Sequence, residues 1–307
     1  MHEFVNGETD TETVVRIVNE VVPWGKQTVD TIEHARKHLK GFRDWIVLVD
    51  GEPAGVGALG ELPDLEDTDV LWVNVSVLRP ARRRGVGSAI HRRVSAHGRS
   101  LGKTRLETLV WEDDPDGLAY AERRGYSCVS RSRGLRLVLA GLPGPEVRAL
   151  DGIVITTLAE RRDLAHGVWK LACETMPEIP MDTDEPFHPG TFEQFTELSL
   201  NGPHSIPEAT FVAVHGDEPV GYGRLTWHDE QAGIGYHQML GVTRDFRGRG
   251  IASVLKAKQI AWAIEHGLTE LRTQNEVRNA PVRALNGHYP YEPMPDMLVM
   301  RGPLAGS

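Results

Sequence analysis

Two short loops rich in arginine and glycine are the segments of this 307-residue sequence best suited to chemistry. The first runs from Arg82 to Gly87 and the second from Arg247 to Ala252, and each stands between an apolar stretch and a helical pattern. The first turn of a helix offers unpaired N–H groups and the positive end of the helix dipole, which together attract anions. Glycine lets a ligand approach the backbone, and arginine adds positive charge. The spacing therefore predicts one phosphate-binding loop in each half.

A dinucleotide-binding fingerprint is an alternative for the first loop, because Glu107 follows it at about 20 residues. Ile90 stands where the third glycine of that fingerprint would fall, and the preceding strands are expected to form hairpins instead of a βαβ unit. A basic nucleic-acid patch is the other alternative. The basic run is confined to the loop, however, and residues 1–150 carry 21 Lys and Arg against 22 Asp and Glu. The matching places of Gly85 and Gly250, 165 residues apart, favour a repeated phosphate loop.

The elements expected around each loop follow one order: two helices, a hairpin, a strand that enters the loop, a long helix, a strand, a short helix and a last strand. In the first half these are 11–21, 28–40, 45–59, 70–78, 86–97, 104–111, 117–124 and 135–139. In the second half they are 163–175, 191–199, 210–226, 234–242, 251–266, 270–274, 281–288 and 297–301. A sequence of this length is about two domains long. A Gly/Pro cluster at 140–146 predicts domains at 1–140 and 153–307, joined by a linker at 141–152.

This order of elements, with Gly125-Tyr126 after the short helix, resembles the GNAT acetyltransferase superfamily. In the second half, Leu255-Lys256, Thr273-Gln-Asn275, Asn279 and Leu285-Asn286 resemble a group of tandem actinobacterial GNAT proteins with mycothiol synthase-like architecture. The resemblance covers nearly the whole chain. It implies an α/β class with a mixed (α+β) sheet, built as two tandem acyl-CoA N-acyltransferase folds.

The resemblance also implies acetyl-CoA, held by the backbone of the strand that enters each loop and by the loop itself. The implied cofactor-binding residues are Val75, Ser76, Val77, Arg82, Arg83, Arg84, Gly85, Val86 and Gly87 in the first half, and Leu240, Gly241, Val242, Arg247, Gly248, Arg249, Gly250, Ile251, Ala252, Asn279 and Asn286 in the second. In such folds this strand separates from the next one, and the pantetheine arm pairs with the exposed backbone. For Asn279, a helix N-cap is the alternative role.

GNAT enzymes typically use a carboxylate as base and a tyrosine of the last helix as acid, and this sequence departs from both patterns. Leu71 and Tyr236 stand at the base position of mycothiol synthase-like proteins, and Ala121 and Asn286 stand at the acid position. The remaining candidates for catalysis lie in the second half: Tyr236, His237, Tyr289 and Tyr291. A histidine near its ordinary pKa can act as a base at neutral pH, and a tyrosine hydroxyl can act as an acid. Packing of these side chains in the core is the alternative.

The acyl acceptor is expected to be a small amine such as an amino sugar or a polyamine. Residues 151–307 carry 13 Lys and Arg against 21 Asp and Glu, and Asp182, Asp184 and Glu185 follow the first helix of that half, where they could hold a cation. A solvated acidic loop is the alternative. The sequence thus predicts an acetyl-CoA-dependent N-acetyltransferase, an acyltransferase whose C-terminal half is active; a catalytically silent acetyl-CoA-binding sensor or scaffold is the second hypothesis.

The remaining expectations concern location and partners. Two cysteines without partner spacing and the absence of a long apolar run favour a cytoplasmic protein without a membrane span. We expect a monomer or homodimer with no metal site and no nucleic-acid partner.

Overall fold

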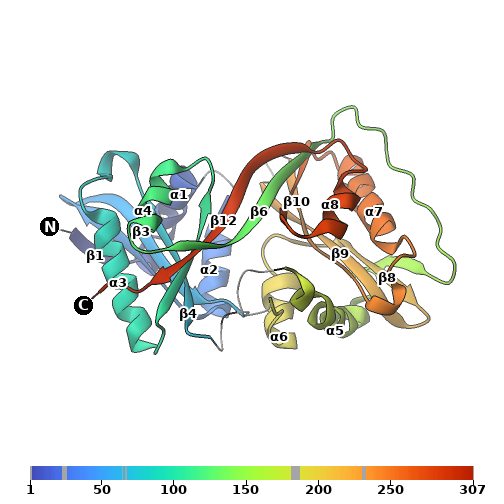
Figure 1. The fold of residues 1–307 in the computed structure, drawn as a ribbon, viewed down its shortest axis with the longest axis horizontal. Coiled ribbons are helices and arrows are strands. Elements are labelled where there is room, and N and C mark those ends of the chain that lie inside the picture. The colour runs from blue at the N-terminus through green and yellow to red at the C-terminus, as the bar shows by residue number, and fades with distance from the viewer. Residues whose placement is uncertain are drawn as a thin grey trace. The chain divides into compact units, whose positions relative to one another are not determined.

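The computed structural model describes residues 2–22, 26–63, 65, 68–180, 187–229 and 233–306. By contacts the chain divides into two compact units (Figure 1): unit 1 takes in residues 1–130 and 298–307, and unit 2 takes in residues 131–297. In the part of the chain that is described, no helix has both the length and the apolar character needed to span a membrane.

Unit 1 is built from the elements of the first half and the end of the last strand. They are β1 (His2–Asn6), η1 (Gly7–Thr9), α1 (Thr11–Val21), α2 (Val29–His38), β2 (Lys40–Val49), β3 (Glu52–Glu61), β4 (Val70–Val77), η2 (Arg79–Ala81), α3 (Val86–Ser100), β5 (Arg105–Trp111), α4 (Pro115–Glu122) and the start of β6 (Ser127–Val138). The sheet order is β1-β2-β3-β4-β5-β12.

Unit 2 repeats this order. Its elements are β7 (Val154–Thr157), η3 (Arg162–Leu164), α5 (Ala165–Thr175), η4 (Met176–Glu178), α6 (Phe192–Phe195), the π-helical η5 (Thr196–Leu200), β8 (Ser205–His215), β9 (Glu218–Asp229), β10 (Ile234–Val242), η6 (Arg244–Phe246), α7 (Ile251–Glu265), β11 (Glu270–Glu276), α8 (Ala280–Asn286) and β12 (Glu292–Pro303). The sheet order is β7-β8-β9-β10-β11-β6.

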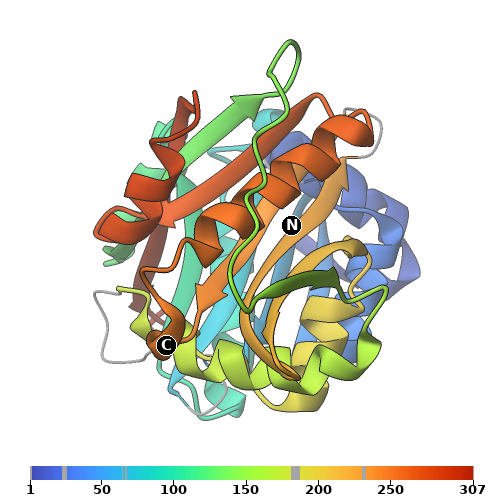
Figure 2. The ribbon, with the colours of Figure 1, turned by 90° about the vertical axis from the view of Figure 1, so that its right-hand side faces the viewer.

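Helices cover both faces of each sheet because side chains alternate along its strands. In unit 2, Phe211 and Ala213 of β8 share a core with α7, whereas Val212 and Val214 share one with α5. Figure 2 shows α7 crossing one face of the unit 2 sheet. In unit 1, α3 packs on one face, and α1 and α2 contribute Val14, Ile17 and Ile32 to the core on the other. The predicted α/β class with a mixed sheet is confirmed.

The last strands are exchanged between the sequence halves, which differs from the expected division at residues 140 and 153. The expected strand at 135–139 belongs to β6, which pairs antiparallel with β11 from Glu270↔Val138 to Glu276↔Ser132 and so completes the sheet of unit 2 instead of the first. Residues 298–303 of β12 enter unit 1, where β12 follows β5 in the sheet.

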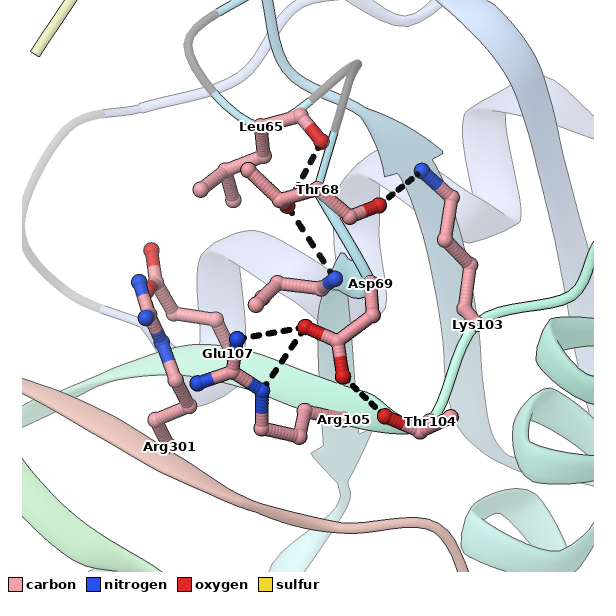
Figure 3. Close-up of polar contacts among 9 residues, drawn as sticks. Leu65, Thr68, Asp69, Lys103, Thr104, Arg105, Glu107 and Arg301 are labelled. Atoms are coloured by element: carbon pink, nitrogen blue, oxygen red, sulfur yellow. Dashed lines mark hydrogen bonds and ion pairs between the residues drawn. The ribbon is translucent and has the colours of Figure 1, made fainter. Parts of the chain in front are cut away.

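A buried ion pair holds the end of β12 in unit 1 (Figure 3). Arg301 Nη2 lies 2.7 Å from Glu107 Oε2 on β5, and Arg301 Nε donates to the same oxygen at 3.0 Å. Beside this pair, Arg105 Nε donates to Asp69 Oδ1 at 2.9 Å. The alternating apolar pattern of a strand does not say which sheet it will join; the position of the charged partner contributes to that choice.

Candidate active site

A cleft of about 830 Å³ opens in unit 2 where β10 and β11 separate. The two strands pair in parallel only from Ile234↔Glu270 to Tyr236↔Arg272. Beyond that point, residues from His237 to Val242 on one side and from Thr273 to Glu276 on the other line the cleft. On its other edge, β10 pairs with β9, and the register shifts between His237 and Leu240, which places one extra residue on β10. The backbone of β10 is therefore open to a ligand along this stretch.

The predicted phosphate loop of unit 2 closes one end of the cleft. Gly250 begins α7 at φ 83°, and Gly248 has φ 76°, both in the left-handed region that favours glycine. No side chain caps the first turn of α7, so its N–H groups face the loop. Arg247 Nε donates to the carbonyl of Val242 at 2.9 Å and thereby ties the loop to the end of β10.

These features fit the pyrophosphate and pantetheine arm of an acyl-CoA. A Cβ on Gly248 would meet nothing within 4 Å, so the space above the loop is open. The uncapped N–H groups of α7 suit a phosphate, and the unpaired edge of β10 suits the amides of an extended chain. Arg247 also lies 2.5 Å from Glu178 of η4, which Arg244 contacts at 2.6 Å. The Glu178 carboxylate thus holds Arg247 of the loop and Arg244, which precedes it.

A buried chain of three polar side chains connects α7, β10 and the residue before β12. His237 Nδ1 lies 3.0 Å from Gln259 Oε1, and His237 Nε2 lies 3.0 Å from the Tyr291 hydroxyl. Burial, followed by the charge of Lys256, lowers the pKa of His237 well below its ordinary value, so the imidazole is neutral at pH 7. Because an amide oxygen only accepts, Nδ1 carries the proton, and the Tyr291 hydroxyl donates to Nε2. His237 is the member of the predicted catalytic set that lines the cleft.

Lys256 of α7 lies next to this chain and also lines the cleft. It is 3% exposed, and its Nζ stands 5.2 Å from the centroid of the Tyr291 ring. Burial lowers the pKa of this ammonium to about 7. The sequence alone gives this lysine no catalytic role, because lysines in the middle of helices are mostly exposed to solvent. The available signal was Ile260, a buried apolar residue four positions further along the same helix face.

The other predicted residues of unit 2 occupy different places. Tyr236 precedes His237 in β10, so its side chain lies on the opposite face of the sheet. Its hydroxyl accepts a hydrogen bond from Arg272 Nη1 at 3.2 Å. Tyr289 is half-buried and meets Tyr291 edge to face. Asn279 caps α8 by accepting from the N–H of Val282 at 3.4 Å, as its alternative role anticipated, and it also lines the cleft.

Two further predictions for unit 2 concern an asparagine and an acidic segment. Asn286 is buried and donates to Asn275 Oδ1 at 2.5 Å. Asp182, Asp184 and Glu185 lie outside the described residues.

Unit 1 has the same kind of cleft, of about 780 Å³, with a different loop environment. Pairing of β4 with β5 ends at Trp72↔Glu107, and Gly85 begins α3 at φ 81° without a side-chain cap. A Cβ on Gly87 would lie 2.9 Å from the Tyr120 ring, whose hydroxyl donates to the Gly87 carbonyl at 2.6 Å. The close approach that requires glycine at position 87 is therefore made by the protein's own tyrosine.

The arginines of this loop are paired with carboxylates of the same unit. Arg82 and Arg83 lie 3.3 and 3.1 Å from Asp116 of α4, and Arg84 lies 2.9 Å from Asp50. The strand β4 pairs with β3 in unbroken register from Trp72↔Gly60 to Val77↔Gly55, without the shift seen in β10. Unit 1 thus repeats the cleft of unit 2 but not the local shape of its strand.

Comparisons with known proteins agree with this geometry. The sequence profile of the acetyltransferase (GNAT) family matches residues 11–126 and 166–286. Mycothiol acetyltransferase of Mycobacterium avium is 29% identical over 259 residues, which cover 79% of this chain and 74% of that protein. N-alpha-acetyltransferase MAK3 of Arabidopsis thaliana is 33% identical over 113 residues, or 36% of this chain and 56% of that protein.

Solved structures show the same tandem fold. A tandem GNAT protein from the clavulanic acid biosynthesis pathway superposes with a TM-score of 0.79 and 19% identity over the whole of both chains. A GCN5-related N-acetyltransferase from Sphaerobacter thermophilus gives a TM-score of 0.72 with 18% identity, over 99% of this chain and 96% of that one. The expectation of two tandem folds is confirmed.

Proposed function

Because this chain belongs to the acetyltransferase (GNAT) family and is an acyltransferase, we propose that it transfers an acetyl group from acetyl-CoA to a small amine in the cleft of unit 2. The observation that carries the proposal is the open edge of β10, which leads from the shifted register at His237 to the uncapped glycine loop at Gly250. The family profile does not favour the silent sensor or scaffold, which would need neither a reactive cleft nor a proton-handling group.

In this proposal the loop residues 247–252 hold the pyrophosphate, and residues 240–242 pair with the pantetheine arm. Asn279 and Asn286 stand at the side of α8 and support the wall of the cleft. The equivalent residues 75–77 and 82–87 form a second, weaker site, because Tyr120 already packs against Gly87 of its loop. Coenzyme A brings the thioester; the protein contributes orientation, charge and proton transfer.

The proton-handling pair is His237 and Tyr291. Amine acetylation requires that the attacking ammonium lose a proton, and Nε2 of the neutral His237 imidazole is the proposed acceptor. The Tyr291 hydroxyl donates to Nε2 in this structure, so it must release that lone pair before the proton can bind there. Tyr289 supports this pair by packing edge to face against Tyr291, whereas Tyr236 is held by Arg272.

The acceptor is an amine such as an amino sugar or polyamine, with Asp182, Asp184 and Glu185 as its proposed anionic contacts. The surplus of eight negative charges in residues 151–307 supports a cationic ligand (21 Asp and Glu against 13 Lys and Arg). Cys128 and Cys173 are free thiols, which supports a cytoplasmic location. We propose a monomer or homodimer that acts on small molecules and not on nucleic acid.

The test combines calorimetry with acetyl-CoA and a thiol-release assay over a panel of amines. Arg247→Ala is expected to weaken acetyl-CoA binding and turnover, whereas Arg82→Ala, its match in unit 1, leaves turnover unchanged. Tyr291→Phe should lower turnover, with Tyr126→Phe as the matched control. No heat with acetyl-CoA at high micromolar concentration would refute the proposal, and equal loss in both members of each pair would refute the choice of unit 2.

A further inference from the structure

A buried lysine lines the cleft of unit 2, and its ammonium contacts an aromatic ring but no carboxylate of the described residues. Among the described residues, Lys256 Nζ makes no hydrogen bond and no ion pair, although the side chain is 3% exposed and lines the cleft. Buried ammonium groups are ordinarily paired. The other charged groups that line this cleft have partners: Glu178 holds Arg244 and Arg247, and Glu276 holds Arg278 at 3.0 Å. The N–H donors of Lys256 Nζ are therefore available to a ligand in the cleft.

The same position in unit 1 also carries a basic side chain that faces a cleft. His91 lies 165 residues before Lys256, on α3, and lines the cleft of unit 1. Its Nε2 lies 3.2 Å from the hydroxyl of Tyr126, which is the match of Tyr291. Burial, with the charges of Arg124 and Arg92, lowers the pKa of His91 to about 4. Two independent clefts therefore place a titratable nitrogen on the long helix, against the aromatic ring that follows the short helix.

The Tyr291 hydroxyl is not free to give its proton to a ligand. Its hydrogen is directed at His237 Nε2, and Tyr291 is absent from the cleft lining. Asn286, at the position where the family's acid is expected, is bonded to Asn275 and has no acidic proton. The departing sulfur of a thioester therefore needs a donor from elsewhere in the cleft wall.

We propose that Lys256 is a catalytic residue that donates a proton from Nζ to the sulfur of coenzyme A as the thioester breaks; this inference rests on the proposed function. The amine, already without one proton, attacks the acyl carbon, and a C–N bond forms while the carbonyl π electrons move to oxygen. When the carbonyl re-forms, the C–S bond breaks and its electron pair stays on sulfur. Nζ–H passes its proton to that sulfur to give the free thiol. The second proton of the acceptor nitrogen then returns to Nζ, so the lysine is regenerated.

The electrostatic setting suits this step. An ammonium with a pKa of about 7 is a stronger acid than an ordinary thiol, whose pKa is about 8.5, so transfer to the thiolate is downhill. The neutral amine that remains is the form that burial favours. The titratable groups that face Lys256 are His237 from β10 and Tyr291 ahead of β12, both uncharged at neutral pH; Glu276 of β11 lines the cleft but is held by Arg278.

The test uses the full chain and two acetyl donors with different leaving thiols: acetyl-CoA and an acetyl ester of 4-nitrothiophenol, whose thiolate leaves without protonation. The acceptor is the best amine from the panel. Lys256→Met should lower turnover with acetyl-CoA about 10²- to 10⁴-fold and leave its KM for acetyl-CoA unchanged. With the nitrothiophenyl ester the loss should shrink to less than about tenfold, since no acid is needed. Lys258→Met, two residues along α7, serves as the matched control.

A second variant separates proton donation from simple charge. Lys256→Arg keeps a cation that does not release its proton, so it should be about as slow as Lys256→Met with acetyl-CoA. An equal loss of Lys256→Met with both donors, or full activity of Lys256→Arg, would overturn the inference while leaving the proposed function intact. Failure of the unmodified protein to bind acetyl-CoA or to acetylate any amine would overturn both. Circular dichroism of each variant confirms that the fold is retained.

Discussion

Replacing Lys256 with methionine should stabilise the protein, and more at acid than at alkaline pH. The side chain is buried in the wall between α7 and β10, where methionine has a similar length and no charge to desolvate. The ordinary pKa of a lysine is 10.5, and burial lowers that of Lys256 to about 7. Desolvation of the charged ammonium therefore lowers the free energy of unfolding at every pH where the folded protein keeps this lysine protonated.

The size of this term follows from the shift. Each pKa unit corresponds to about 1.4 kcal/mol, so the penalty approaches about 5 kcal/mol as an upper limit below pH 7, where the lysine is protonated in both states. Between pH 7 and 10.5 the unfolded chain binds more protons than the folded one, so the free energy of unfolding rises with pH. From pH 6 to pH 9, the advantage of Lys256→Met over the unmodified protein should fall by about 2 to 3 kcal/mol.

Urea unfolding of both proteins at pH 6, 7, 8 and 9, followed by circular dichroism, measures this difference directly. All other titrating groups are common to the two proteins and cancel. Lys258→Met is the control for loss of a helix lysine, and its stability difference should not follow the same curve. If the free-energy difference for Lys256→Met were the same at pH 6 and pH 9, the lysine would titrate normally in the folded protein, and the argument from burial would be wrong.

Three further outcomes test the fold. Arg301→Met should destabilise unit 1 by about 3 to 5 kcal/mol in urea unfolding, because Glu107 is left buried and unpaired. A Glu107→Leu/Arg301→Met double variant should recover most of this loss. A loss below about 1 kcal/mol in the single variant would contradict the expectation. Gly250→Ala should lower the free energy of unfolding by about 1 to 2 kcal/mol, because φ is 83°, and should also weaken acetyl-CoA binding in calorimetry; unchanged values for both would speak against the loop geometry. Hydrogen bonds from Arg105 and Thr104 lower the pKa of Asp69 from 3.8 to about 2, so its contribution is present above pH 4 and lost as pH falls toward 2. Since the pair is partly exposed, Asp69→Asn should cost about 1 kcal/mol or less at pH 7, and a cost that persists at pH 2 would contradict the assignment.

The matching order of elements in the two halves could be predicted from the sequence because each element depends on local patterns. Gly85 and Gly250 occupy equivalent helix starts, and the left-handed φ at both is a conformation that glycine adopts without strain. The strands that enter the loops and the helices that leave them follow from the period of apolar residues. The order of elements is enough to indicate the family and hence the cofactor.

The partner of each side chain could not be predicted in the same way. His237 and Tyr291 are 54 residues apart, and nothing in the local sequence says that their polar atoms meet at 3.0 Å. Tyr120 stands one residue before the acid position at Ala121, and nothing in the local sequence says that it packs against Gly87. Hydrogen bonds between distant elements depend on how sheets and helices stack, and that information is spread over the whole core.

The sequence by itself therefore determined that two arginine–glycine loops begin two long helices, since backbone conformation and helix termini are local properties. Only the tertiary structure decided that β6 closes the sheet of unit 2 and that the end of β12 enters unit 1, because many strands could satisfy the same apolar pattern. It also decided that Lys256 is buried in the cleft wall instead of solvated. The protonation of a side chain is set by the water and charges around it, and these are fixed only when distant segments pack together.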